Sequence, residues 1–270
     1  MLSERERKQA LERLRPWIER ARTFSGWFGL TPFPDFNVRL LEAGPPWDYA
    51  SLVREYARDA QSVLDLGTGG GEFIADVRDG LPARVVATEE WHVNAPVAYR
   101  RLRPLGVDVV RARSLQLPFA DGTFDLVIDR HEELSPSEVA RVLRPGGRVL
   151  TQQVGPENWR ELRAYFSSAT AGNRSRIADF GDIRGEYASG FADAGLRVTR
   201  NESHDYRVAY GGLGEMLFML LITPWTIPDF DVDGDLEALL ALEKGCTTSD
   251  GLVMTWDRFL LVAEEPAVNG

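Results

Sequence analysis

One stretch of the chain constrains the fold more than any other. It runs from Val63 to Phe73 and reads Val-Leu-Asp-Leu-Gly-Thr-Gly-Gly-Gly-Glu-Phe. The apolar residues at its start predict a buried strand. The glycines predict a loop in which the backbone can approach a ligand closely, because glycine tolerates backbone angles that other residues avoid. We expect a helix to begin after this loop, so the stretch predicts a strand, a ligand-binding loop and a helix in succession.

Two common phosphate-binding loops do not fit this stretch. A dinucleotide loop requires Gly-x-Gly-x-x-Gly, and the third glycine is replaced by Glu72 or by Ile74 in the two possible frames. A P-loop requires a lysine after the glycines, and none follows. Asp65 ends the strand, where its carboxylate would repel a pyrophosphate and attract an ammonium or sulfonium group. The loop therefore favours a cationic ligand.

The region after residue 62 alternates between short β-rich runs and helix-length segments. This order predicts a parallel sheet with helical crossovers, a doubly wound α/β fold. Helices are also expected at Ser135–Leu143, Glu157–Ser168 and about Glu186–Ala194. The expected strands are Val63–Leu66, Arg84–Thr88, Val107–Arg111, Phe124–Asp129, Arg148–Gln153, Leu196–Ser203 and Met254–Ala263.

The segments outside this alternating region predict two additions to the sheet. Residues 1–60 form an N-terminal helical extension or lid, whose helix from Ser3 to Arg22 begins with a capping box between Ser3 and Glu6. Residues 61–270 form the main domain, and residues 206–250 form a late helical cap inserted between its last two strands. Both additions are rich in aromatic side chains, which favours an apolar, enclosed pocket beneath them.

Four motifs in order resemble the class I S-adenosylmethionine (SAM)-dependent methyltransferases. The first is Asp65-x-Gly67-x-Gly69-x-Gly71, which resembles the family's glycine-rich loop. The second is Val85–Glu89, similar to the second strand that ends in the acid binding the ribose hydroxyls. The other two are Ser114–Ile128, similar to the third and fourth strand region, and Arg141–Leu150, similar to the helix, turn and fifth strand. The resemblance covers about residues 62–155.

The resemblance implies a Rossmann-like sheet of seven strands in the order 3-2-1-4-5-7-6, with the seventh antiparallel. It also implies SAM as the cofactor. An acid that often binds the adenine amino group is replaced by Arg113, so we expect the backbone near Ser114 to hold the adenine instead. The cofactor-binding residues that we expect are Asp65, Gly67, Thr68, Gly69, Gly71, Glu89, Trp91, Ser114, Leu115 and Asp129. Leu115 or Trp91 would lie against the adenine face, although Trp91 fits simple packing equally well.

His131 is the candidate general base. It follows the fourth strand, whose end the resemblance places beside the methyl group, and imidazole titrates near neutral pH. The acidic chain should slightly favour its protonated form, so activity should rise with pH through the imidazole range. A capping or hydrogen-bonding histidine is the alternative interpretation. Arg130, Gln153 and Trp225 are the candidate substrate contacts.

Composition excludes several other classes of function. The 31 basic and 41 acidic residues give a net charge of −10, which argues against a nucleic-acid surface. One cysteine and three scattered histidines make no metal-binding pattern. The single cysteine cannot form an internal disulfide, and no leader or membrane-spanning segment is evident, so we expect a cytoplasmic protein.

These observations predict an enzyme that transfers a methyl group from SAM to an oxygen or nitrogen atom of a small organic molecule. Two alternatives stay open. One is an RNA methyltransferase, which the acidic charge and the lack of an Asn-Pro-Pro-Tyr-like motif disfavour. The other is a non-enzymatic SAM-binding regulatory protein, which would need no substrate pocket.

Overall fold

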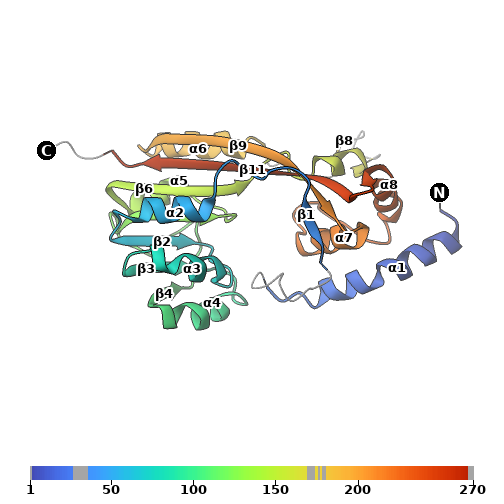
Figure 1. Cartoon of the computed structure of the whole chain (residues 1–270), viewed down its shortest axis with the longest axis horizontal. Helices are drawn as coiled ribbons and strands as arrows, with labels where there is room; N and C mark the ends of the chain where they lie inside the picture. The colour runs from blue at the N-terminus through green and yellow to red at the C-terminus, as the bar shows by residue number, and fades with distance from the viewer. Residues whose placement is uncertain (1, 27–35, 169–173, 176, 178–180, 267–270) are drawn as a thin grey trace.

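The computed structural model describes residues 2–26, 36–168, 174–175, 177 and 181–266, and they form an elongated molecule with two lobes (Figure 1). The first lobe is built on the sheet and the second is mostly helical. The helices are α1 (Glu4–Arg22), α2 (Tyr49–Ala57), α3 (Glu72–Val77), α4 (Ala95–Leu102), α5 (Pro136–Val142), α6 (Ile183–Asp193), α7 (Leu213–Ile222) and α8 (Leu236–Cys246), with short 3-10 turns at Arg78–Gly80, Arg103–Leu105 and Arg160–Ala164. The strands are β1 (Val38–Leu40), β2 (Ser62–Leu66), β3 (Arg84–Thr88), β4 (Val107–Val110), β5 (Phe124–Arg130), β6 (Leu143–Val154), β7 (Ser167–Ser168), β8 (Arg174–Ser175), β9 (Arg197–Tyr210), β10 (Thr247–Thr248) and β11 (Gly251–Glu264).

The main sheet confirms the expected strand order and corrects the strand count. Its path is β1-β9-β11-β6-β5-β2-β3-β4. The seven strands from β4 to β9 have the order expected from the sequence, and β11 is antiparallel to both neighbours. The described sheet has nine strands rather than seven, because β1 pairs with the outer edge of β9 and β10 pairs with β11. Both added strands are two or three residues long and carry no periodic sequence signal.

Helices cover both faces of the sheet, as a doubly wound fold requires. Helices α2, α3 and α4 bury residues such as Val53, Ile74 and Leu102 against one face. Helices α5 and α6 bury Val139 and Phe191 against the other face. The central strands β2, β3 and β5 are buried on both sides, because each of them lies between two cores, whereas most of the outer strand β9 is exposed or partly buried.

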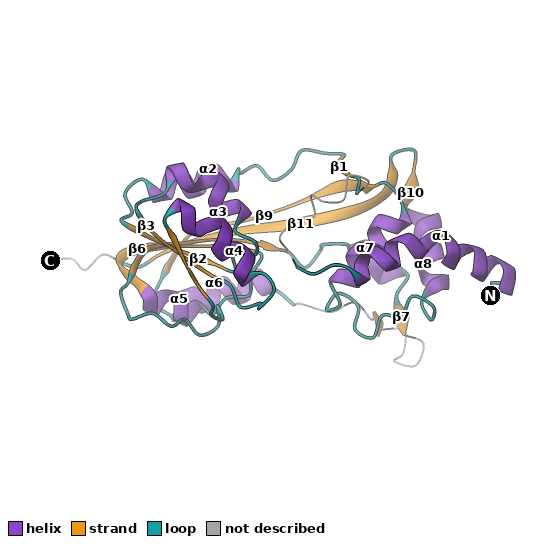
Figure 2. Cartoon of the chain, turned by 90° about the horizontal axis from the view of Figure 1, so that it is seen from below, coloured by secondary structure: helices purple, strands orange, loops and turns teal. Residues whose placement is uncertain are grey.

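The second lobe has a hydrophobic core of its own. It combines α1, α7, α8 and the far ends of β9 and β11, which extend beyond β6 as a two-stranded ribbon. Figure 2 shows this ribbon joining the two lobes. Since β9 runs parallel to β6 and enters the second lobe, the carboxyl ends of the parallel strands face that lobe. Ligand crevices of such sheets lie at these ends.

The structure confirms the N-terminal helix that the sequence predicts, whereas another predicted helix does not form. The capping box of α1 is present, with Ser3 and Glu6 bonded reciprocally. The expected helix Glu157–Ser168 is wrong: a short 3-10 turn replaces it. Its backbone is tied to β11 instead, since the Trp159 N–H donates to the Thr255 carbonyl at 2.8 Å and the Glu161 carboxylate accepts from the Thr255 N–H at 3.0 Å.

Several apolar side chains of the late insertion form core. Met216 and Phe218 have no exposed surface, and Leu14 of α1 is buried with Met216 in the same cluster. These residues pack as core rather than as pocket lining, and the expected enclosed pocket beneath the two segments stays a prediction. The expected division of the chain at residue 60 stays a prediction, although α2 packs on the sheet through Tyr49, Val53 and Ala57 rather than with α1.

Candidate functional site

The glycine loop joins β2 to α3 at the carboxyl edge of the sheet. Gly67, Gly69 and Gly71 have φ angles of 60°, 60° and 79°, which side chains other than glycine rarely adopt. Gly67 is constrained twice, because a Cβ atom there would lie 2.6 Å from the Glu132 Cβ. The Thr68 N–H donates to the Thr88 carbonyl at 2.8 Å and fixes the loop against β3. The loop is therefore a rigid cradle.

Glu89 directly follows β3, and its carboxylate is hydrogen-bonded to the backbone of the glycine loop. One carboxylate oxygen accepts a hydrogen bond from the Gly69 N–H at 2.7 Å, and the other accepts from the Trp91 N–H at 2.8 Å. The Asn94 side chain also donates to this carboxylate, which leaves at least one oxygen lone pair to accept a hydrogen bond from a ligand hydroxyl. Burial is the main cause of the raised pKa of Glu89. This geometry fits a ribose hydroxyl group.

The residues around the loop also fit a cationic group. Among the described residues, Thr68 Oγ1 is a buried side-chain oxygen with no hydrogen-bond partner. Burial, followed by neighbouring carboxylates, raises the pKa of Asp65 to about 7. A group that carries positive charge would stabilise the ionised form of this carboxylate. The cradle therefore fits SAM, with Glu89 toward its ribose and Asp65 toward its cationic end.

Glu132 is a site residue that the sequence analysis missed. Its side chain lies against Gly67, and one carboxylate oxygen is 3.4 Å from the Ser114 hydroxyl, which donates to it. Burial raises the pKa of Glu132 to about 7, and the charges of Glu89 and Glu90 add to the effect. Its position three residues after Asp129, at the end of a central strand, is the signal that could have found it.

The Asp129 side chain lies in a buried hydrogen-bond network, and its expected contact with the cofactor stays a prediction. Its side chain has no exposed surface, and one carboxylate oxygen accepts from Thr151 Oγ1 at 2.8 Å and from Gln153 Nε2 at 2.6 Å. Gln153 Nε2 also donates to the Glu132 carbonyl at 2.7 Å, so this amide is turned into the protein rather than toward a substrate. Tyr49, also missed, donates its hydroxyl to the Asp129 carbonyl at 2.7 Å. This network positions the end of β5.

His131 stands at the expected strand end, in a strained conformation with φ of 70°. Its N–H donates to the Gln152 carbonyl at 2.9 Å, which fixes the backbone beside β6. Desolvation by the surrounding protein, followed by the charges of Arg258 and Arg130, lowers the pKa of His131 to about 3. The expected preference for the protonated form is wrong, because this desolvation and the two nearby arginines outweigh the distant acidic surface. His131 is neutral at physiological pH.

The remaining candidate residues differ in their burial and in the residues that they contact. Trp91 is partly buried beside Glu89, and Ser114 is buried beside Glu132. Leu115, in the segment that follows β4, is 48% exposed, and its contact with adenine stays a prediction. Arg113 forms an ion pair with Glu90 at 2.7 Å. Trp225 is 54% exposed in the second lobe, and its substrate contact also stays a prediction.

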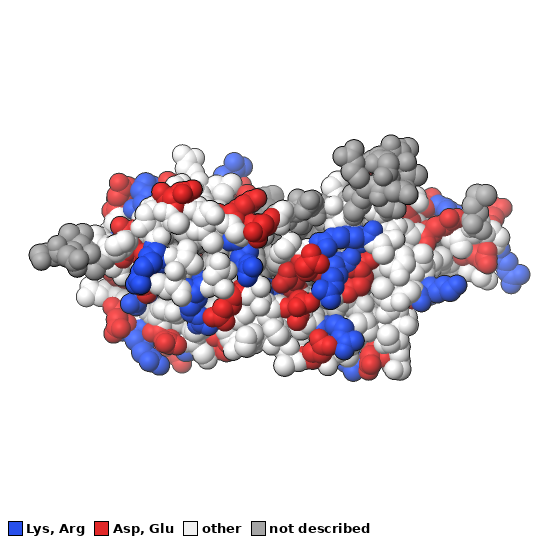
Figure 3. Space-filling model, turned by 90° about the horizontal axis from the view of Figure 1, so that it is seen from above, with Lys and Arg blue, Asp and Glu red and all other residues white. Residues whose placement is uncertain are grey.

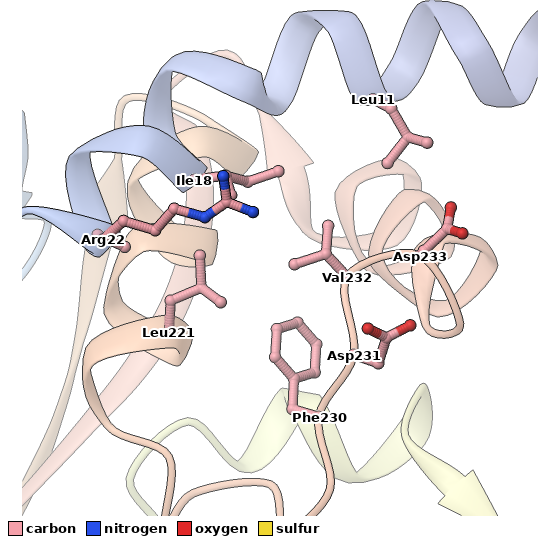
Figure 4. Close-up of a pocket in the computed structure, with 9 residues that line it drawn as sticks. Leu11, Ile18, Arg22, Leu221, Phe230, Asp231, Val232 and Asp233 are labelled. Carbon is pink, nitrogen blue, oxygen red and sulfur yellow. The ribbon is translucent and has the colours of Figure 1, made fainter.

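A groove of about 530 Å³ lies between α1 and the late insertion (Figure 4). Its apolar lining is supplied by both segments, and charged groups lie at its rim. None of its lining residues belongs to the glycine loop, so it is separate from the site described above. The lining residues are Leu11, Ile18, Ala21, Arg22, Leu221, Phe230, Asp231, Val232 and Asp233.

Other types of site find no support in the described part of the chain. No group of three or more potential ligands could hold a metal ion there. None of the described helices has the length and apolar character needed to cross a membrane. Figure 3 shows acidic and basic side chains intermixed over the face that it displays.

Comparisons with known proteins show that part of this chain is similar to methyltransferases. Residues 64–151 match the family model described as a methyltransferase domain. The chain is 33% identical to a demethylmenaquinone methyltransferase of Beutenbergia cavernae over 128 residues, which are 44% of this chain and 52% of that protein. It is 37% identical to a ubiquinone/menaquinone biosynthesis C-methyltransferase of Haemophilus ducreyi over 119 residues, 38% of this chain and 45% of that protein. The chain thus spans about half the length of the curated relatives it matches.

One solved structure resembles the fold over nearly the whole chain. It is a functionally unknown protein from Deinococcus radiodurans R1, with a TM-score of 0.61 and 14% identity. The likeness covers 93% of this chain and 99% of that chain. At this identity the comparison shows the fold alone. The two-lobed arrangement therefore has a counterpart among solved proteins.

Proposed function

We propose that this chain, which carries a class I SAM-dependent methyltransferase domain, transfers a methyl group from SAM to a small organic molecule bound at the edge between the lobes. The observation that carries the proposal is the set of carboxylates around the glycine loop. Asp65, Glu89 and Glu132 meet there from three different strand ends. Such a set favours a cationic cofactor and disfavours a pyrophosphate.

The proposal also concerns the atom that accepts the methyl group. The sequence favoured oxygen or nitrogen, and one relative is named as a C-methyltransferase of quinone biosynthesis. An activated carbon therefore joins oxygen and nitrogen as an acceptor in the proposal. An electron-rich ring that carries hydroxyl groups offers both a ring carbon and a hydroxyl oxygen as the acceptor.

The protein's own contribution is binding and alignment. When bound, SAM supplies a methyl group on a positively charged sulfur as the electrophile. Glu89 holds a ribose hydroxyl group, and Asp65 and Glu132 favour positive charge above the loop. His131 can accept a hydrogen bond from the acceptor, but its lowered pKa makes it a weak base. Alignment of the two reactants then accounts for most of the rate enhancement.

Calorimetric titrations with SAM, S-adenosylhomocysteine and NAD⁺ test the proposal. We expect saturable binding of the first two and none of NAD⁺, because the loop lacks the dinucleotide frame. Binding of NAD⁺ in place of SAM would overturn the proposal. Transfer of label from methyl-labelled SAM to a panel of hydroquinones and phenols then tests the acceptor class, and labelling of RNA instead would support the alternative enzyme.

A further inference from the structure

Arg258 lies on β11, opposite Val154 of β6 and His204 of β9, where the sheet meets the second lobe. Its Nη1 atom donates to Asn158 Oδ1 at 2.8 Å and to the Asp257 carbonyl at 2.7 Å. Within residues 2–26, 36–168 and 181–266, its Nε and Nη2 atoms donate no hydrogen bond, and its guanidinium forms no ion pair with a carboxylate. The Nε and Nη2 edge of the guanidinium is therefore open in the sense that no described residue accepts a hydrogen bond from it; the side chain is partly buried, and the guanidinium lies 5.0 Å from the centre of the Trp256 ring.

Arg130 shows the same lack of a carboxylate partner. It ends β5, and its guanidinium lies 4.4 Å from the centre of the Phe73 ring, above the helix that follows the glycine loop. No ion pair joins it to any residue in the described part of the chain. Arginines elsewhere in the molecule do have such partners, for example Arg160 with Asp205 at 2.9 Å. Arg130 is exposed, however, and its charge acts on the Asp65 carboxylate, so Arg258 is the partly buried arginine of this region that forms no ion pair with a described residue.

Strand pairing places Arg258 close to His131. Arg258 lies opposite Val154 of β6, and the His131 N–H donates to the carbonyl of Gln152, two residues earlier on the same strand. The charge of Arg258 lowers the pKa of His131, which agrees with this placement. In the sheet Arg258 lies on the β6 side of His131, whereas Asp65, at the end of β2, lies on the other side.

A partly buried arginine without an anionic partner is costly unless a ligand supplies the charge. The Nε and Nη2 edge is the planar fork that binds a carboxylate or phosphate through two parallel hydrogen bonds. We propose that the methyl acceptor is an organic oxyanion, a carboxylate or a phosphate ester, whose acidic group binds the open edge of Arg258, with Arg130 adding to the attraction. This inference rests on the proposed methyl-transfer function and narrows its substrate class.

Proton NMR of the histidines tests this inference without turnover. The chain has three histidines, and the His131→Asn variant identifies the His131 signal. Benzoate and phenyl phosphate are titrated as probes in the presence of S-adenosylhomocysteine, with benzamide as the neutral control. We expect at least one anion to shift the His131 signal saturably and to raise its pKa, while benzamide does neither. The anion that binds tighter identifies the acidic group.

Variants localise the effect. Arg258→Met should weaken anion binding at least tenfold, and Arg258→Lys should recover only part of it because it lacks the fork. Arg84→Met, at the opposite edge of the sheet, should leave anion binding unchanged. Equal binding of benzamide, no binding of either anion, or full anion binding by Arg258→Met would overturn the inference. If S-adenosylhomocysteine binds in these experiments, such a failure leaves the proposed function standing; if it does not bind, the proposed function itself has failed.

Discussion

The replacement of Glu89 by glutamine gives a sharp test of the cofactor site. The carboxylate already accepts the Gly69 and Trp91 N–H groups, and its remaining acceptor capacity is proposed to bind the ribose. A hydrogen bond to a charged group contributes about 1.5–3 kcal/mol. At about 1.4 kcal/mol per factor of ten, Glu89→Gln should weaken S-adenosylhomocysteine binding about 10- to 150-fold.

The same substitution should have a smaller effect on stability than on binding. Both carboxylate oxygens accept backbone N–H groups, and the glutamine amide nitrogen cannot replace one of them, so one of these hydrogen bonds is lost. Burial raises the pKa of Glu89, which means that the folded protein disfavours its ionised form relative to the unfolded chain, and removal of the charge offsets part of this loss. The temperature of unfolding without cofactor should therefore fall only slightly, and a folded variant that has lost affinity identifies a binding group.

Glu90 provides the matched control. It is the next residue along the chain, but it is exposed and pairs with Arg113 on the surface. Glu90→Gln should leave the affinity within about twofold, since an exposed ion pair contributes little. Isothermal titration calorimetry at one pH and ionic strength measures both variants. A folded Glu89→Gln variant with the affinity of the Glu90→Gln control would refute the assignment of Glu89.

Three further predictions follow from the same contacts. The pKa values of Asp65 and Glu132 are raised to about 7, so these groups become ionised as the pH rises from 6 to 8. Over this range the affinity for SAM, whose sulfur is charged, should increase relative to that for S-adenosylhomocysteine, and the increase should be smaller in Glu132→Gln. A relative affinity for SAM that falls with pH would contradict this prediction. His131→Asn should keep the wild-type pH–rate profile between pH 6 and 8, because the lowered pKa leaves the imidazole neutral there; an inflection near 6.5 that disappears in the variant would show a titrating base. Leu14→Ala should lower the free energy of unfolding by about 2–5 kcal/mol in urea titrations, because Leu14 is 1% exposed in the second-lobe core, and a loss below about 0.5 kcal/mol would contradict that packing.

Much of the first lobe is predictable from the sequence because its signals are local. The glycine loop, the apolar strands and the Ser135 cap of α5 each depend on neighbouring residues. The strand order came from the family resemblance, and the structure confirms it. The edge strand Val38–Leu40 was missed because its position depends on pairing with residues 208–210, far along the chain.

The candidate site was less predictable, since its electrostatics depend on distant residues. The pKa of His131 is lowered partly by Arg258, which lies on the last strand, and no sequence pattern links the two. The backbone carbonyl of Glu132 is held by the Gln153 side-chain amide, which donates to it, and the Asp129 carbonyl accepts from the hydroxyl of a tyrosine on a separate helix. Trp159 shows the reverse case, in which tertiary hydrogen bonding to β11 replaced a locally favoured helix.

The most direct test of the central claim is a crystal structure of the protein with S-adenosylhomocysteine. We predict that the ribose hydroxyls lie within hydrogen-bonding distance of the Glu89 carboxylate. The sulfur should lie between the Gly67 loop and His131, facing the open edge of Arg258. A ligand bound elsewhere, such as the groove between α1 and Phe230, or one whose sulfur points away from His131, would contradict the account.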